Sequence, residues 1–390
     1  MNFDFKVDEL CNYCKVNKRV YCPHKPILKL KSQKIFEKTY FFGPTPPSVF
    51  VGHYNYPMVS TSSILLLDEK INPNPKYWYG LDFQKLFYIA SMQIKAQAPL
   101  ANQRILENIK ETALSLKHVD IEAEYKNKPK LIINFDQVNN PLGPIAKLKD
   151  FKIAQNISVP KKIEELLQED IKTSQAIEQL VLSGFDEFYI TRLFSIGLLG
   201  KKHSKHLVPT KWSITATDNL IANFYIKKLK ALPILDFILL FENEYLGNRF
   251  FIILLPKSWG FENIECWIAN NKNKYAISKE WEGYDLRTKY ASSQGGGYYA
   301  AKHAIAESLV NIIRKQAAVV VIREITPKYA LAVGVWEVRE SIRNAFKKTP
   351  LKFANIKELF YYLKEKLLLD LRIYLARSDF LEQKTLDKFY

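Results

Sequence analysis

Two kinds of hydrophobic pattern alternate along the chain, and together they predict a fold that mixes strands with helices. Residues 232–241 and 249–256 are nearly continuous apolar runs of strand length, which is typical of buried strands. The polar segment between them contains Gly247 and predicts a hairpin turn. Further strand-like runs lie at residues 131–138, 317–325 and 330–338.

Helical spacing is clearest in residues 158–184. Pro160 lies near the start of this segment, apolar residues follow at helical spacing, and Gly184 is a stop signal. The mixture indicates an α+β or mixed α/β fold with a large core, and the pattern leaves the topology open. Helical character also marks residues 82–117, 292–316 and 355–377, whereas residues 39–60 predict a docked loop or short strands.

The charge of the chain narrows the choice of partner. Of the 390 residues, 57 are basic and 40 are acidic, which gives a formal net charge of +17. An excess of this size suits a polyanion such as DNA, RNA or an anionic membrane surface. A lysine-rich surface that only keeps the protein soluble is the alternative.

Membrane insertion is not expected. The longest apolar runs, at 232–241 and 249–256, are too short to cross a hydrocarbon core about 30 Å thick. The N-terminal residues carry acids and have no apolar signal-peptide core. We therefore expect an intracellular, cytoplasmic protein without a membrane partner.

Three of the four cysteines form a cluster that predicts a structural zinc site. In the stretch CNYCKVNKRVYCPH, a Cys-x-x-Cys turn is followed by a returning Cys-x-His pair. Four such ligands suit tetrahedral Zn²⁺ and leave no open position for a catalytic water. Ordinary thiols beside a surface histidine are the alternative. The predicted ligands are Cys11, Cys14, Cys22 and His24, and the loop between them carries the predicted phosphate contacts Lys15, Lys18 and Arg19.

The segment QKTLDKFY, residues 383–390, has the pattern of a short recognition element. Leu386, Phe389 and Tyr390 stand at positions i, i+3 and i+4, so one helical or 3₁₀ turn places them on one face. Gln383 adds a side-chain amide ahead of that turn. This is the pattern of peptides that bind the PCNA sliding clamp. A tail that docks on its own domain is the alternative.

Two further segments contain candidate nucleic-acid contacts. In SSQGGGYYAAK, glycines precede a helix whose first N–H groups suit a phosphate, although the segment is not a Walker A loop. In PTKWSITATDN, a tryptophan suits stacking on a base and a lysine suits a phosphate. A flexible loop and a core tryptophan are the alternatives. The predicted contacts are Lys211, Trp212, Arg287, Gly295, Gly296, Gly297 and Lys302, and further favoured cations are Arg249, Arg323, Arg339 and Arg343.

No catalytic motif is evident, and the weak catalytic candidates are Asp218, Glu282 and His53. A metal nuclease would bind Mg²⁺ through converging carboxylates, but no spacing forces convergence on this chain. Asp218 is more commonly a helix cap, and His53 lacks an identifiable Ser or Cys partner. The full set of candidate carboxylates is Asp136, Asp218, Glu280, Glu282, Asp285 and Glu324.

Several motifs in the same order resemble the archaeal Nre family of DNA repair proteins. They are the N-terminal cysteine cluster, GPTPPSVFVGHYNYP, LVPTKWSITATDN, GGGYYAAKHA, VVVIREITPKYALAVGVWEVRESIRNAF and QKTLDKFY. The resemblance implies a role in DNA damage repair and binding to PCNA through the tail. It brings no established catalytic mechanism. The sequence departs from the family pattern at two places. His24 stands where the family has a fourth cysteine, and Met58-Val59 follows the Tyr-Pro motif where the family has a Gly-Pro-Met-like stretch.

Together these features predict a DNA repair factor that binds DNA and is recruited to PCNA. A metal-dependent nuclease or nucleotide-using transferase acting on DNA is the first alternative, and an RNA-binding factor is the second. Whether the protein is an enzyme stays open. The expected domains are a zinc-binding segment at 1–30, the Nre N-terminal region at 31–275, the Nre C-terminal region at 276–380 and the clamp-binding tail at 381–390.

Overall fold

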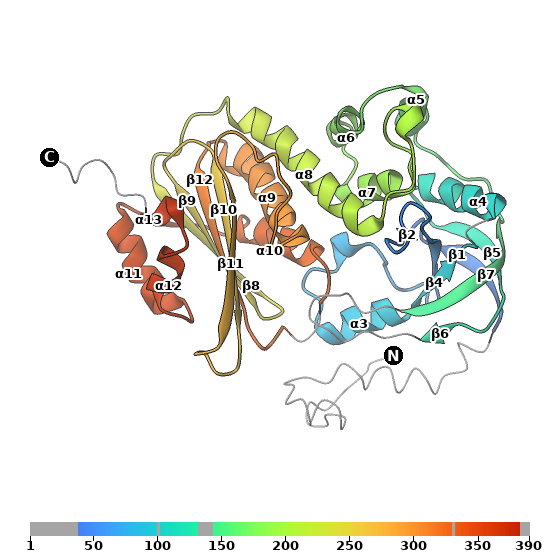
Figure 1. The fold of residues 1–390 in the computed structure, drawn as a ribbon, viewed down its shortest axis with the longest axis horizontal. Coiled ribbons are helices and arrows are strands. Elements are labelled where there is room, and N and C mark those ends of the chain that lie inside the picture. The colour runs from blue at the N-terminus through green and yellow to red at the C-terminus, as the bar shows by residue number, and fades with distance from the viewer. Residues whose placement is uncertain (1–37, 100–101, 132–142, 330–331, 383–390) are drawn as a thin grey trace. The chain divides into compact units, whose positions relative to one another are not determined.

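The described residues form two compact units. The structure, a computed structural model, describes residues 38–99, 102–131, 143–329 and 332–382 (Figure 1). Unit 1 takes the described residues up to Leu220 with those of 331–334, and unit 2 takes the rest. The division falls inside helix α8 (Thr210–Leu229). The predicted zinc cluster and the tail 383–390 lie outside the described residues.

A mixed sheet forms the centre of unit 1. Its strand order is β1-β5-β7-β4-β3-β2, with β6 paired to β7; β4 and β7 are parallel, and the other pairs are antiparallel. Burial alternates along β5, as expected for a strand with one face on a core. The strands are β1 (Tyr40–Thr45), β2 (Val49–Val51), β3 (Thr61–Leu66), β4 (Gln93–Gln97), β5 (Val119–Tyr125), β6 (Lys130–Leu131) and β7 (Pro144–Ile153).

Most helices of unit 1 begin at a side-chain cap or at proline. Asp82, Asn102 and Asp186 each accept a hydrogen bond from a backbone N–H in the first turn of α3, α4 and α7. The predicted helical region 158–184 is two helices, because the backbone is extended at Glu169 and Lys172. The helices are α3 (Phe83–Ser91), α4 (Gln103–Leu114), α5 (Lys161–Gln168), α6 (Thr173–Leu182) and α7 (Glu187–Ser195), with 3₁₀ turns η2 (Pro75–Tyr77) and η3 (Lys202–Ser204).

Unit 2 contains a second mixed sheet, of order β11-β10-β12-β9-β8-β13. Only β10 and β12 are parallel. Its strands are β8 (Ile238–Tyr245), β9 (Asn248–Leu255), β10 (Gly260–Ile268), β11 (Tyr275–Glu282), β12 (Ala318–Ile325) and β13 (Leu351–Phe353). Its helices are α9 (Gly296–Ser308), the π-helical turn η4 (Leu309–Ile313), α10 (Trp336–Ala345), α11 (Ile356–Lys366), α12 (Leu371–Leu375) and α13 (Asp379–Glu382).

The predicted hairpin in this sheet is confirmed. Strands β8 and β9 pair antiparallel and are joined by Leu246 and Gly247, both with positive φ. A Cβ on Gly247 would lie 2.6 Å from the backbone nitrogen of Tyr329, so only glycine fits there without rearrangement. The strand begins at Ile238 rather than at residue 232, and the stretch before it is not buried, since Ile234 and Phe237 are 44% and 46% exposed.

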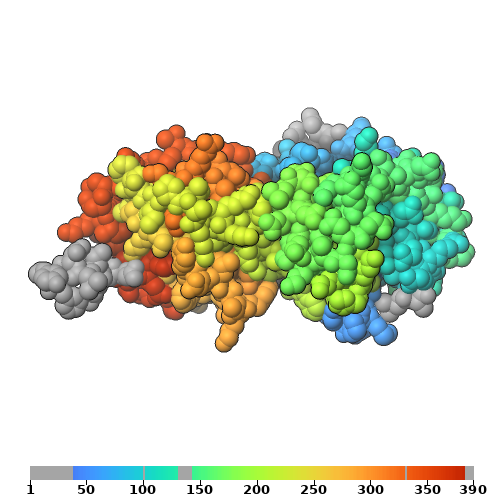
Figure 2. All heavy atoms as spheres, turned by 90° about the horizontal axis from the view of Figure 1, so that it is seen from above, coloured from blue at the N-terminus to red at the C-terminus, as the bar shows by residue number. Residues whose placement is uncertain are grey.

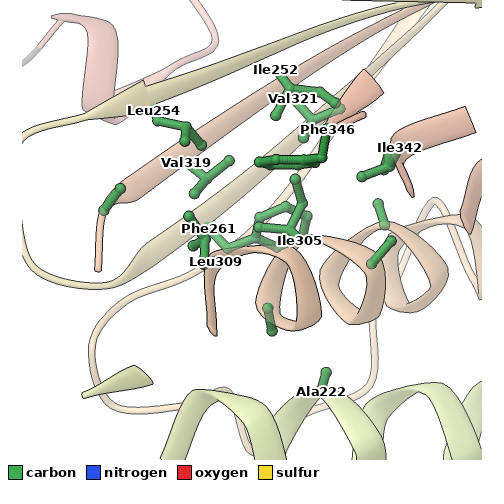
Figure 3. Close-up of a cluster of buried hydrophobic side chains, with 14 of the residues drawn as sticks. Ala222, Ile252, Leu254, Phe261, Ile305, Leu309, Val319, Val321, Ile342 and Phe346 are labelled. Atoms are coloured by element: carbon green, nitrogen blue, oxygen red, sulfur yellow. The ribbon is translucent and has the colours of Figure 1, made fainter. Parts of the chain in front are cut away.

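Helices cover both faces of the unit 2 sheet. Val319 and Val321 point towards α8, α9 and α10, where Figure 3 shows them packed near Ile305 and Phe346. Val320 belongs to the core on the opposite face, under α11, α12 and α13 (Figure 1). This three-layer arrangement explains the continuous apolar runs of β9 and β12, because neither face of these strands meets water.

Two sequence expectations are wrong in unit 2. The run 330–338 was expected to be a strand, yet its described residues 332–335 lie in no strand, because Gly334 has a φ of 104°, and α10 begins at Trp336. The segment 355–377 is not one helix, because α11 ends at Lys366 and α12 begins at Leu371. Of the expected strand 131–138, only its first residue lies within the described part of the chain.

The mixed class of fold is confirmed by the two sheets with their helices. Within the described ranges, none of the helices combines the length and the apolar character that a membrane span needs.

Candidate nucleic-acid interface

A loop of unit 1 exposes an unusual number of large apolar side chains. We call residues 52–60, between β2 and β3, the aromatic loop; the exposed fractions of Tyr54, Tyr56 and Met58 are 79%, 41% and 69%. The Gly52 N–H donates to the Ser60 carbonyl (2.8 Å) and closes its base. A Cβ on Gly52 would lie 2.7 Å from Ser60 Oγ, so glycine permits this closure.

Strand β2, which leads directly into the aromatic loop, is tied to the start of α8 by a hydrogen bond. The Val51 N–H donates to Thr210 Oγ1 (2.8 Å), and the Ser195 hydroxyl lies 2.9 Å from that oxygen. The Val208 N–H donates to the Ser195 carbonyl at 2.9 Å. Val59 and Ile196 belong to one small core beneath these bonds. Segments far apart in sequence are thus held together on one side of unit 1.

This fastening brings aromatic rings from different segments into contact. The rings of Tyr56 and Trp212 lie 5.0 Å apart at an interplanar angle of 61°, and Tyr56 lies 6.4 Å from the ring of His206. His53 and Tyr54 lie 4.2 Å apart. Trp212 is 46% exposed. In Figure 2, a group of blue atoms from the N-terminal part of the described chain projects at the edge of unit 1.

A strongly basic stretch lies beside these rings in the sequence and in the fold. We call residues 201–211, KKHSKHLVPTK, the basic segment; it contains no acidic residue. Lys202, Lys211 and His206 are exposed. Asp170 contacts the segment by accepting a hydrogen bond from the Lys202 N–H (2.7 Å), and this bond lowers the pKa of that carboxyl. The combination of exposed rings and cations suits a polyanion that carries flat groups.

The predicted contacts Lys211 and Trp212 both lie on this surface, as does His53. Trp212 is not a core residue, so the alternative interpretation of this tryptophan is wrong. Asp218 is 1% exposed and lies in the interior of α8, so it is not a helix cap. His53 is exposed, and its ring lies 4.2 Å from that of Tyr54 at an interplanar angle of 31°.

The glycine-rich loop of unit 2 gives its donors to a carboxylate of the chain itself. Glu280 accepts hydrogen bonds from the Ser292 hydroxyl (2.9 Å), from both the N–H and the hydroxyl of Ser293 (2.7 and 3.0 Å), and from Arg287 (2.8 Å). Burial alone would raise the pKa of Glu280, but these donors lower it to about 2. The predicted phosphate contact Arg287 is therefore engaged by an acid.

The glycines of this loop permit close packing against a second acid. Gly295, with φ of 49°, precedes α9, and Gly296 and Gly297 open the helix. A Cβ on Gly297 would lie 2.8 Å from Glu265 Oε1. A phosphate at this helix start would meet that carboxylate, so the geometry does not favour the expected phosphate cradle.

Lys302 was predicted to contact nucleic acid, but it does not reach the surface. It is 1% exposed, and its ammonium donates to Glu282 Oε2 (2.8 Å) and to Asn223 Oδ1 (3.0 Å). Burial lowers the pKa of the lysine, and Glu282 works against that change. The weak catalytic candidate Glu282 is thus half of a buried ion pair rather than an open ligand for Mg²⁺.

Of the other favoured arginines of unit 2, Arg249, Arg323 and Arg343 pair with acids. Arg323 contacts Glu265 (2.9 Å) and Glu337 (3.2 Å) in the interior. Burial raises the pKa of Glu337 to about 7, although Arg323 opposes the change. Arg339 is buried. Arg249 pairs with Glu324 (2.5 Å), and Arg343 pairs with Glu307 (2.7 Å) and Glu340 (2.6 Å).

No cluster of three His, Cys, Asp or Glu side chains suited to a metal ion occurs among the residues that the structure describes. The predicted zinc ligands and their neighbouring cations lie outside those residues, as does the predicted clamp-binding tail. Asp136 lies outside them as well.

Sequence reasoning missed most of the aromatic loop. Tyr54, Tyr56, Met58 and His206 were not singled out, although they belong to one exposed surface. A signal was present in the string HYNYPM, because large apolar residues around Asn and Pro cannot all be buried in a short turn. The run KKHSKH was a second signal.

Two models of one protein family match most of the chain. The family model described as Archaeal Nre, N-terminal matches residues 14–272, and that described as Archaeal Nre, C-terminal matches residues 282–389. The sequence-based boundary at 275/276 lies between these matches, whereas the compact units divide at 220/221. No solved structure shows significant similarity to the chain.

Curated relatives carry names from DNA repair. DNA repair protein NreA of Archaeoglobus fulgidus is 34% identical over 324 residues, which cover 80% of this chain and 81% of the relative. DNA repair protein NreA of Haloferax volcanii is 31% identical over 340 residues, again covering 80% and 81%. DNA repair protein NreB of A. fulgidus is 31% identical over 384 residues, covering 95% of this chain and 96% of the relative.

Proposed function

This chain belongs to the archaeal Nre family, and on that premise we propose that it is a DNA repair factor that binds DNA and is recruited to PCNA. The names of its relatives support the repair role. The surface formed by the aromatic loop and the basic segment supports binding to DNA. The segment 383–390 supports recruitment to the clamp.

The observation that carries the DNA-binding part is the exposure of cations beside rings in unit 1. Lys202 and Lys211 are exposed in a segment without acids, whereas Lys302, Arg287 and Arg323 of unit 2, which were expected to bind phosphate, have acidic partners. An exposed lysine pays little desolvation on meeting a phosphate and releases a counterion from the nucleic acid. The phosphate contacts are therefore assigned to unit 1.

Recruitment to PCNA rests on the sequence of the tail. Leu386, Phe389 and Tyr390 would form the apolar face of one turn, and Gln383 would add a polar contact. A tethered protein has a raised effective concentration at DNA that carries the clamp, without any new DNA contact. The predicted zinc site would add a small folded segment whose lysines and arginine would also contact DNA phosphates. Its ligands would be Cys11, Cys14, Cys22 and His24.

The enzymatic alternatives gain no specific support. Glu282 is bound to Lys302 and Glu280 is bound to Arg287, so neither acid offers an open pair of oxygens. A nuclease or transferase would first have to break these ion pairs, which costs about 3–5 kcal/mol for a buried pair.

DNA binding is tested with the double variant Lys202→Gln/Lys211→Gln in the full-length chain. Fluorescence anisotropy with labelled DNA, between about 50 and 200 mM salt, gives the dependence of affinity on salt. We expect the slope of log K against log[salt] to become shallower by roughly 0.7 per lost contact on single strands and roughly 0.9 on duplex.

The matched control is Lys357→Gln/Lys364→Gln, which removes two exposed lysines from α11. It should leave the slope unchanged. Equal slopes for both double variants would refute the assignment of the basic segment, and absence of any DNA binding would refute the function.

A further inference from the structure

We infer that the surface of unit 1 binds single-stranded DNA, with unpaired bases stacked on Tyr54, Tyr56 and Trp212 and the phosphates along the basic segment. This inference rests on the proposed function, because it specifies which form of DNA the protein takes. It adds a binding mode and a substrate class that the family match does not supply.

The exposure of the rings points to bases that have free faces. Tyr54 is 79% exposed and Trp212 is 46% exposed, so both rings offer large apolar areas to a ligand. In a duplex each base already stacks on its neighbours, and the rings would gain little beyond phosphate contacts. On a single strand, stacking contributes roughly 1–3 kcal/mol per base. Only unpaired bases therefore use the most prominent feature of this surface.

The rigidity of the support favours such a ligand. The base of the aromatic loop is closed by the Gly52–Ser60 hydrogen bond (2.8 Å), and Val51 is tied to Thr210 of α8 (2.8 Å). Within the loop, the Met58 N–H donates to the Asn55 carbonyl (2.8 Å), and Asn55 itself has a φ of 60°. A loop that is ordered before binding loses less conformational entropy when its rings stack on bases.

The charge next to the rings selects nucleic acid over an apolar protein partner. The basic segment contains Lys201, Lys202, Lys205 and Lys211 and no acid. A protein partner would have to supply several carboxylates around an apolar centre, whereas a DNA strand alternates phosphates and flat bases by its covalent structure. The ring contacts Tyr56–Trp212 (5.0 Å) and Tyr56–His206 (6.4 Å) bring apolar and basic groups to the same place.

The test measures the affinity of the full-length chain for labelled oligo(dT) and for a hairpin duplex of equal charge, at one fixed salt concentration. The variants are Tyr54→Ala and Trp212→Ala, and the matched control is Tyr361→Ala, which truncates a 75% exposed tyrosine on α11. For oligo(dT) we expect a loss of roughly 5- to 150-fold for each variant, the range that corresponds to stacking of one base. Affinity for the duplex should stay within about twofold, and the salt slope should not change.

A second readout is the intrinsic fluorescence of Trp212, obtained as the difference between the wild type and Trp212→Phe. Quenching of this difference signal by oligo(dT) supports stacking, and a signal that oligo(dT) does not change overturns it. Phenylalanine keeps a ring that can stack on a base. If Trp212→Phe still binds oligo(dT) but no longer shows the quenching of the wild type, the variant is folded.

The remaining outcomes separate this inference from the proposed function. If both DNA forms bind and the aromatic variants match the Tyr361→Ala control, stacking is refuted while the DNA-binding function stands. If oligo(rU) competes at lower concentration than oligo(dT), the DNA assignment is overturned in favour of RNA. If neither nucleic acid binds, both proposals fail together.

Discussion

Glu280 illustrates how a single side chain can be misread from the sequence. It lies on the edge strand β11, and its carboxylate accepts four hydrogen bonds from Arg287, Ser292 and Ser293. A row of hydroxyl and N–H donors in a glycine-rich loop predicts a site for a phosphate, which is an external anion. In the folded chain the anion is internal, and it holds the loop on the sheet.

The replacement Glu280→Gln should therefore destabilise the protein in a pH-dependent way. The pKa of Glu280 in the folded state, about 2, lies below its ordinary value of 4.5. The ionised form thus stabilises the fold; this contribution is complete above about pH 5 and is lost as the pH falls from 4.5 towards 2. We expect the variant to lose about 3 kcal/mol of unfolding free energy near pH 7, as measured by urea denaturation, and little near pH 2.5.

The control for that experiment is Glu365→Gln, on the exposed face of α11. It should change the unfolding free energy by less than about 0.5 kcal/mol at any pH. A deficit of Glu280→Gln that is the same at pH 7 and pH 2.5 would contradict the ion-pair explanation.

At the scale of elements, the short helix α13 shows how the chain leads into its tail. The carboxylate of Glu262, on β10, accepts hydrogen bonds from the Ser378 hydroxyl (2.5 Å) and from the N–H groups of Asp379 (2.9 Å) and Phe380 (3.2 Å). An acid at the first N–H groups of a helix satisfies donors that would otherwise lack partners. Lys279 pairs with Asp379 (2.7 Å) and adds a second attachment.

Deletion of residues 383–390 should therefore remove clamp binding without disturbing unit 2. The contacts described for α13 all stay in the shortened chain, so its thermal unfolding should match that of the wild type. We expect the shortened chain to stop co-eluting with PCNA in size-exclusion chromatography while its affinity for DNA stays unchanged.

The point variant Phe389→Ala/Tyr390→Ala should reproduce the loss, because it removes the apolar face alone. Co-elution that survives the deletion would show that the clamp, if it binds, contacts another surface.

At the scale of the whole molecule, the net charge of the chain does not reveal which cations are available to a ligand. The chain carries a net charge of +17, yet many cations of unit 2 are paired with acids, including Lys302, Arg287 and Arg323. Net charge therefore indicates a polyanion partner but does not show which cations meet it. In unit 1, exposed cations of the basic segment lie beside the exposed rings of Tyr56 and Trp212.

The N-terminal segment should add one metal ion to this molecule. Metal analysis of the purified chain should give about one zinc per chain, and Cys11→Ser/Cys14→Ser should give none, because the site loses half of its ligands. Cys266→Ala is the control; this thiol is buried in β10, so zinc content should not change. A wild-type chain that folds without any bound metal would refute the site.

The sequence by itself determined several local elements and the family, and it indicated a class of partner. Periodicity identified the β8–β9 hairpin and β12, because strands buried on both faces leave continuous apolar runs. The same signal failed for residues 330–338, since Gly334 adopts a positive φ that a strand does not have and a helix begins at Trp336. The excess of basic residues pointed to a polyanion, and the motif order pointed to the family.

Only the tertiary structure decided which residues meet. Tyr56 contacts Trp212 because Val51 bonds to Thr210, and no local pattern encodes a contact across that length of chain. Lys302 was expected at the surface, but Glu282 on a different element balances its charge in the interior. Short-range spacing predicts helices and strands. Whether a charged side chain is buried or exposed depends instead on partners that lie far away in the sequence and meet it only in the folded chain.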